Sequence, residues 1–178
     1  KVTAVDFSAE MLEQARKNAR EKGLPDIVFR QMDAQNLTFA DNSFDFIVTR
    51  NVTWIVEDAK RVYYHIHRVL KPGGILVNLD ANYGKVFQES EQRGEAPTHP
   101  TQTREQLRER NDLAKACAIT QEKRPAWDVE VLIDLGVSKL WVDLDLDKSL
   151  GLAEANRPYT SGSAQTKARM FAVIAKKA

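Results

Sequence analysis

The chain begins with the stretch KVTAVDFSAEML, residues 1–12, in which a strand pattern gives way to a helix pattern. Residues 2–5 are a short, β-branched apolar run typical of a buried strand, and Asp6 ends it. Ser8 is a favourable N-cap for the helix that follows, and Gly23 is suited to end that helix. The order strand, carboxylate, helix predicts a β-α unit at the start of the chain.

The next part of the chain repeats this arrangement. Apolar runs predict strands over residues 27–32, 44–49 and 75–79. An amphipathic helix is predicted from Asp58, with Val62, Ile66, Val69 and Leu70 on its inner face. The breaker cluster at residues 71–74 separates it from the last of these strands. Because strands alternate with helices, we expect an α/β fold with a mostly parallel sheet and helices on both faces.

Carboxylates follow three of the predicted strands, at Asp6, Asp33 and Asp80. In open α/β sheets, ligands bind outside the carboxyl ends of the strands. These three positions are therefore the first candidates for a functional site.

The second half of the chain departs from the alternation. Residues 81–124 are polar, and we interpret them as an inserted segment that caps the substrate side, with a helix over residues 104–119. Residues 127–135 predict another helix, and residues 139–146 and 168–175 predict two strands. Since no helix separates these two strands, they are expected to be antiparallel.

The composition fits a single domain covering residues 1–178, with 43% hydrophobic and 29% charged residues. The net charge of +1 does not point to nucleic acid or an anionic membrane as a partner. No apolar run approaches the roughly 20 residues that a membrane-spanning helix needs. The single cysteine, Cys117, excludes an intramolecular disulfide framework, and we therefore expect a cytoplasmic location. No metal is expected, because His65, His67 and His99 are scattered.

Three segments together resemble the class I S-adenosylmethionine-dependent methyltransferases, in their small-molecule, type 11-like branch. They are residues 2–12, residues 32–45 with the sequence MDAQNLTFADNSFD, and residues 68–74 with the sequence RVLKPGG. The resemblance implies a Rossmann-like three-layer sandwich with a terminal antiparallel strand pair. Within the family, residues 50–54, 80–83 and 124–128 look like a bacterial subgroup.

The resemblance implies S-adenosylmethionine as the cofactor. Asp6 would accept hydrogen bonds from the two ribose hydroxyls, while Asp33 and the backbone N–H of Ala34 would meet the adenine. The full set of candidate cofactor residues is Asp6, Phe7, Met11, Asp33, Ala34, Arg50 and Asn51. Four of these residues have an alternative explanation: Asp6 as a cap, Asp33 as a turn residue, Met11 in the core and Asn51 as a strand-end cap.

Candidates for the substrate pocket are the residues Trp54, Tyr83, His99, Trp127 and Tyr159. Aromatic faces suit a cationic sulfonium, although large aromatic side chains commonly pack in a core. No catalytic residue is assigned. If the acceptor must lose a proton, His99 and Tyr83 are the candidate bases.

The Gly-rich loop of this family is absent from the sequence, in which no G-x-G occurs. Because that loop precedes the acidic residue by about 20 positions, it would lie before residue 1. We therefore expect an N-terminally incomplete domain that lacks the first strand, which would leave an unpaired gap in the sheet. The gap could instead receive a strand from a second copy. The oligomeric state stays open.

The sequence thus predicts methyl transfer from S-adenosylmethionine to a small-molecule acceptor. Two alternatives remain. A degenerate methyltransferase fold could act as a non-catalytic binding module, or the acid after the strand could serve a nicotinamide-dependent oxidoreductase. The terminal strand pair and the Asp33-Ala34 turn count against the oxidoreductase.

Overall fold

A computed structural model describes residues 1–94, 103–151 and 168–178. The strands are β1 (Val2–Asp6), β2 (Ile27–Gln31), β3 (Phe44–Arg50), β4 (Leu70–Asp80), β5 (Val137–Asp143) and β6 (Phe171–Lys177). The helices are α1 (Ala9–Glu21), α2 (Ala59–Val69), α3 (Tyr83–Gln92), α4 (Arg104–Ala116), α5 (Ala126–Asp134) and α6 (Leu146–Ser149). Three short 3-10 turns are η1 (Ala34–Asn36), η2 (Thr53–Ile55) and η3 (Ala118–Gln121).

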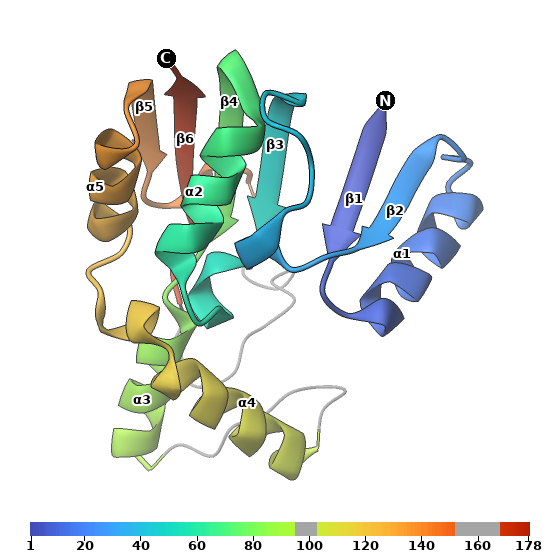
Figure 1. Ribbon diagram of the computed structural model, residues 1–178. Coiled ribbons are helices and arrows are strands. Elements are labelled where there is room, and N and C mark those ends of the chain that lie inside the picture. Colours follow the sequence, from blue (N-terminus) through green and yellow to red (C-terminus); the bar gives the residue numbers. More distant parts are fainter. Residues whose placement is uncertain (95–102, 152–167) are drawn as a thin grey trace.

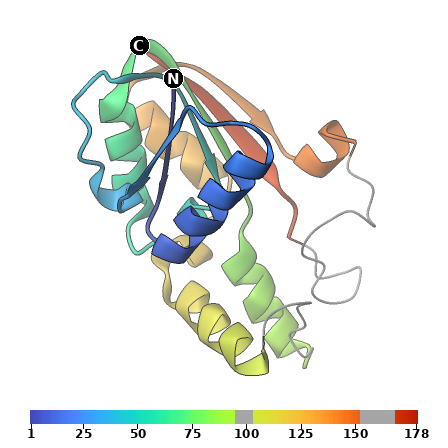
Figure 2. The same ribbon diagram turned by 90° about the vertical axis from the view of Figure 1, so that its right-hand side faces the viewer.

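The strands form two separate groups. Strands β1 and β2 pair in parallel, and a four-stranded sheet has the order β3-β4-β6-β5. In that sheet β3 and β4 are parallel, while β6 is antiparallel to both β4 and β5. Helices α2 and α5 cover one face of the four-stranded sheet, and α1 lies on the other side of the strands (Figures 1 and 2). The α/β fold and the terminal antiparallel pair are confirmed.

In the described part of the chain, β1 and β3 are not paired by backbone hydrogen bonds. Both strands therefore keep an unpaired edge, and the side chains of Val2, Phe46 and Val48 are more than half exposed. This separation agrees with the expected gap between the first two strands and the others.

The core lies where α2 and α5 pack on β4 and β6. The predicted inner face of α2 is confirmed for Val62, Ile66 and Val69, which are buried there, whereas Leu70 is the first residue of β4. Leu76 and Val173 meet them from the sheet. Burial of such side chains stabilises the fold by about 1.5–3 kcal/mol each.

Several element boundaries differ from the prediction. The breaker cluster does not precede β4 but lies inside it, where Gly73 takes a φ of 76° and the pairing with β3 shifts register. Strand β5 stops at Asp143 because its partner β6 starts at Phe171, and Leu146 is buried in α6 instead. Strand β6 itself runs to Lys177 rather than ending at residue 175.

Helix α3 was not predicted within the polar segment, and α4 ends three residues earlier than expected. The side chain of Asn82 caps α3 by accepting a hydrogen bond from the Lys85 N–H. Phe87 provides its buried apolar contact. Gly84 lets this helix approach η3 closely, because a Cβ there would lie 2.1 Å from Oγ1 of Thr120.

Candidate functional site

The carboxyl ends of β1, β2 and β3 lie at the same end of the molecule, at the bottom of Figure 1, and α3 and α4 lie beyond them. The ends of β1 and β2 are tied together by two hydrogen bonds. The Met32 N–H donates to the backbone oxygen of Asp6 at 3.0 Å, and Nε2 of Gln31 donates to the backbone oxygen of Phe7 at 2.9 Å.

Asp6 ends β1 with an exposed side chain. Its Oδ1 accepts a hydrogen bond from the Ser8 N–H at 2.8 Å, and Ser8 in turn caps α1. Among the described residues, no hydrogen bond reaches Oδ2 of Asp6. Phe7 and Met11, which follow Asp6 in the sequence, are 74% and 58% exposed, so neither is packed into the core.

Asp33 occupies the turn after β2. Its Oδ1 accepts from the Gln35 N–H at 2.8 Å and so caps η1, which contains the half-buried Ala34. Oε1 of Gln35 accepts from the Asp58 N–H at 2.8 Å, which fixes η1 against the start of α2. Asp33 therefore does act as a turn residue, which was the alternative explanation from the sequence. Its Oδ1 makes the shorter hydrogen bond, while among the described residues Oδ2 has only a 3.4 Å contact with Nε2 of Gln35.

Asn51 follows β3 in an unusual backbone conformation, with a φ of 54°. Asparagine tolerates this left-handed region better than most residues. Its N–H donates to the Leu79 oxygen at 2.9 Å, and its own backbone oxygen accepts from Nε1 of Trp54 at 3.0 Å. The Tyr83 hydroxyl lies 3.4 Å from Oδ1 of Asn51. Arg50, the last residue of β3, is exposed.

Aromatic rings join η2 to α3 beside Asn51. The rings of Trp54 and Tyr83 are 5.0 Å apart edge to face, and Phe87 lies 6.0 Å from Trp54. The guanidinium of Arg110 on α4 lies 4.6 Å from the Phe87 ring centre. Such pairs each add about 0.5–1.5 kcal/mol beyond burial, so these contacts attach the inserted helices to the end of β3.

Beneath these rings lies a buried ionic network. The side chains of Arg124, Asp80 and Asp128 have no exposed surface, and Nη2 of Arg124 lies 3.3 Å from Asp80 Oδ2 and 2.7 Å from Asp128 Oδ1. The Thr53 hydroxyl accepts from Nη2 of Arg124 at 2.6 Å and donates to Asp80. Phe171 closes the network, with its ring centre 5.0 Å from the guanidinium.

The network continues under α2. The Tyr63 hydroxyl donates to Asp128 at 2.6 Å and accepts from Nδ2 of Asn78. Oδ1 of Asn78 in turn accepts from the Thr49 hydroxyl. Burial, followed by the charge of Asp128, raises the pKa of Tyr63 well above its ordinary value. Tyr63 therefore stays a hydrogen-bond donor at any ordinary pH.

Burial raises the pKa of Asp80, although the charge of Arg124 and the hydrogen bond from Thr53 act in the opposite direction. For Arg124, burial alone would lower the pKa of the guanidinium. The hydrogen bond to Asp128 and the charge of Asp80 more than offset this and raise it, so Arg124 remains a cation.

The other candidate substrate residues are not part of this group. Trp127 packs against the core, with its ring 6.3 Å from that of Tyr63. His99 and Tyr159 lie outside the described residues. The sequence did not single out Arg124, Asp128 and Thr53 as functional side chains. The available signal was the resemblance of residues 50–54, 80–83 and 124–128 to one subgroup, since the network joins these three segments.

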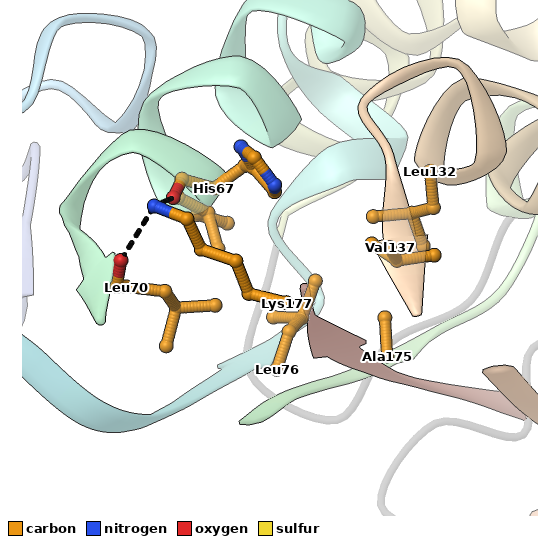
Figure 3. Close-up of a pocket in the computed structure, with 8 residues that line it drawn as sticks. His67, Leu70, Leu76, Leu132, Val137, Ala175 and Lys177 are labelled. Carbon is orange, nitrogen blue, oxygen red and sulfur yellow. Dashed lines mark hydrogen bonds between the residues drawn. The ribbon is translucent and has the colours of Figure 1, made fainter. Parts of the chain in front are cut away.

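A small pocket lies at the opposite end of the sheet, where β6 ends (Figure 3). Nζ of Lys177 donates to the backbone oxygens of His67 and Leu70 at 2.9 and 2.8 Å, which caps the end of α2. Nε2 of His67 is buried and has no hydrogen-bond partner among the described residues. This pocket is apolar apart from these two side chains and lies away from the carboxyl ends of β3 and β4.

In the part of the chain that the structure describes, His, Cys, Asp and Glu side chains do not gather into a group that could hold a metal ion. Within the same residues, no helix has the length and apolar character needed to span a membrane.

The family match lies in the first half of the chain. Residues 1–78 match the family described as a methyltransferase domain. A phosphatidylethanolamine N-methyltransferase of Cereibacter sphaeroides is 42% identical over 77 residues, which cover 43% of this chain and 38% of that protein. The C-methyltransferase UbiE of Desulfotalea psychrophila is 42% identical over 79 residues, covering 44% of this chain and 31% of that protein. The match thus spans less than two fifths of either relative.

Solved structures match nearly the whole chain. An S-adenosylmethionine-dependent methyltransferase of Mesorhizobium loti aligns with a TM-score of 0.64 and 20% identity, over 99% of this chain and 80% of that chain. One from Thermotoga maritima, described as a possible histamine N-methyltransferase, aligns with a TM-score of 0.64 and 18% identity, over 99% and 73%. At such low identity, these matches show a shared fold.

Proposed function

We propose that the whole protein is a methyltransferase, because residues 1–78 match the methyltransferase-domain family and the chain shares its fold with solved S-adenosylmethionine-dependent methyltransferases. It transfers a methyl group from S-adenosylmethionine to a small-molecule acceptor. The two relatives are named a phosphatidylethanolamine N-methyltransferase and a C-methyltransferase of ubiquinone and menaquinone biosynthesis, which supports this class of substrate. The single cysteine supports a cytoplasmic location.

The observation that carries the proposal is the pair of carboxylates at the ends of two neighbouring parallel strands, Asp6 on β1 and Asp33 after β2. Asp6 fits a ribose, since its carboxylate is exposed and one oxygen has no hydrogen-bond partner among the described residues. Asp33 and Ala34, both half-buried in the adjoining turn, would hold the adenine. Phe7 and Met11 offer exposed apolar surface beside the same strand end.

When bound, S-adenosylmethionine supplies a methyl group that its sulfonium already makes electrophilic. The residues of this chain then have mainly to orient the acceptor and to exclude water. We assign this task to Asn51, Trp54 and Tyr83, which we call the acceptor wall, with Arg50 beside it. No general base is assigned among the described residues, and the Tyr83 hydroxyl is directed at Asn51.

The test is titration calorimetry of the complete protein with S-adenosylhomocysteine. Asp6→Ala is expected to weaken binding about 10- to 100-fold, because two hydrogen bonds to a charged group are lost. Asp26→Ala is the matched control, since Asp26 is also exposed but lies in the turn before β2. Absence of binding by the wild-type protein, or equal binding by Asp6→Ala, would refute the assignment.

A further inference from the structure

Three segments far apart in the sequence meet behind the acceptor wall. Thr53 comes from the turn after β3, Asp80 ends β4, and Arg124 precedes α5. Hydrogen bonds join all three side chains, and all three are fully buried. Neither solvent nor a substrate can therefore reach them, so their effect on the site must pass through the residues they hold.

Thr53 connects the buried ionic network to the acceptor wall. Its hydroxyl accepts from Arg124 and donates to Asp80, so both of its hydrogen-bonding roles are used inside the network. Trp54 is the next residue, and Asn51 lies two positions before Thr53. The Trp54 indole closes this short turn by donating to the backbone oxygen of Asn51.

We propose that Arg124 and Asp80 are positioning residues that act through the Thr53 hydroxyl to fix the turn carrying Asn51 and Trp54 against Tyr83. Asp80 also accepts from the Ala81 N–H at 2.8 Å, which places the start of α3, and hence Tyr83, relative to the same carboxylate. One buried group thus orients both halves of the acceptor wall. The functional meaning of the wall rests on the proposed function, whereas the positioning of its residues does not.

The charge in this network fits a positioning role better than a role in stability alone. A buried ion pair often stabilises a fold no more than apolar residues of the same volume would, because desolvation offsets its attraction. What the guanidinium adds is two donor nitrogens held in one plane. Nη2 contacts Thr53, Asp80 and Asp128, while Nε donates to Oδ2 of Asp128 at 3.0 Å. Lysine has a single nitrogen and could not make both sets of contacts.

The experiment compares Thr53→Val with Thr53→Ser in the full chain. Valine removes the Thr53 hydroxyl at nearly constant side-chain volume and leaves the ion pairs of Arg124 with Asp80 and Asp128. Serine keeps the hydroxyl. Ile66→Val is the control for a general loss of packing, because Ile66 is buried on α2 and takes no part in the network. If Thr53→Val does not fold, Asp80→Asn takes its place, since it weakens the hydrogen bond between Thr53 and residue 80 and keeps the shape of the side chain.

Two signals are measured. The first is the indole N–H resonance of Trp54, assigned with Trp54→Phe, and the second is the affinity for S-adenosylhomocysteine. We expect Thr53→Val to shift the resonance. It should also weaken binding about 5-fold or more, the effect of losing one typical hydrogen bond, because the same turn carries Asn51, which is also a candidate cofactor residue. Thr53→Ser and Ile66→Val should stay near wild type. An unmoved Trp54 resonance in Thr53→Val, or equal shifts in valine and serine variants, overturns the proposal. If the wild-type protein does not bind the probe, the proposed function fails, and the resonance still decides whether the wall is positioned this way.

Discussion

Nη2 of Arg124 lies 2.7 Å from Oδ1 of Asp128, one helical turn further along the chain, and neither side chain is exposed to solvent. The same guanidinium also serves Asp80 and Thr53. Removal of the guanidinium would therefore leave two buried carboxylates without a neighbouring positive charge.

Arg124→Met is expected to lower the free energy of unfolding by about 3–5 kcal/mol, the usual effect of breaking a buried ion pair from one side. Urea denaturation measures it. Lys71→Met is the matched control, since the pair of Lys71 with Asp45 is exposed, and its loss should have a much smaller effect. A triple variant that also carries Asp80→Asn and Asp128→Asn should regain part of the loss. Equal effects of Arg124→Met and Lys71→Met would contradict this account.

Gly84 allows α3 to lie against η3. An alanine Cβ at this position would meet Oγ1 of Thr120 at 2.1 Å and the Ala114 oxygen at 2.9 Å, so the helix has to move. We expect Gly84→Ala to destabilise the protein by about 1–3 kcal/mol. In a Thr120→Ala background the cost should be smaller, because the nearest atom is gone, and a double-mutant cycle measures the difference. Strict additivity of the two substitutions would show that they do not meet.

Stability should fall on mild acidification because of His67. Burial, and then the charge of Lys177, lower the pKa of His67 in the folded state, and within the described part of the chain its Nε2 has no hydrogen-bond partner. The unfolded chain therefore takes up a proton near pH 6.5 while the folded chain does not, so stability is lost as pH falls below that value. The free energy of unfolding is measured between pH 7.5 and about 5.

His67→Leu should flatten this dependence. Part of the slope will remain, because burial and the charge of Arg68 also lower the pKa of His65. His65→Gln isolates that second contribution. If His67→Leu keeps the full slope of the wild type, the buried imidazole is not its source.

Local patterns were sufficient for most of the fold. Ser8 caps α1 and Val62 and Ile66 face the core as expected, because caps and helix periodicity depend on a few neighbouring residues. Helix α3 escaped prediction since its apolar contact is concentrated in Phe87, and its partners come from η2 and α4. The end of β5 likewise depends on where β6 begins, which no local pattern states.

The candidate site was predictable in part for the same reason. Asp6 and Asp33 could be recognised because each directly follows an apolar strand. The role of Arg124 could not, because its partners Thr53 and Asp80 lie 71 and 44 residues away and are brought to it only by folding. An arginine in a polar stretch is ordinarily a solvated residue.

Asp33 provides a test that separates a turn residue from a cofactor ligand. Asp33→Ser keeps an oxygen that can cap the Gln35 N–H of η1, so the free energy of unfolding should change by less than about 1 kcal/mol. It removes the carboxylate that would accept from the adenine amino group, and binding of S-adenosylhomocysteine should weaken roughly 10-fold. Asp33→Ala removes both, and it should lose the same affinity and further stability. Wild-type affinity in Asp33→Ser, together with a stability loss confined to Asp33→Ala, would reduce Asp33 to a turn residue and leave Asp6 as the carboxylate that defines the site.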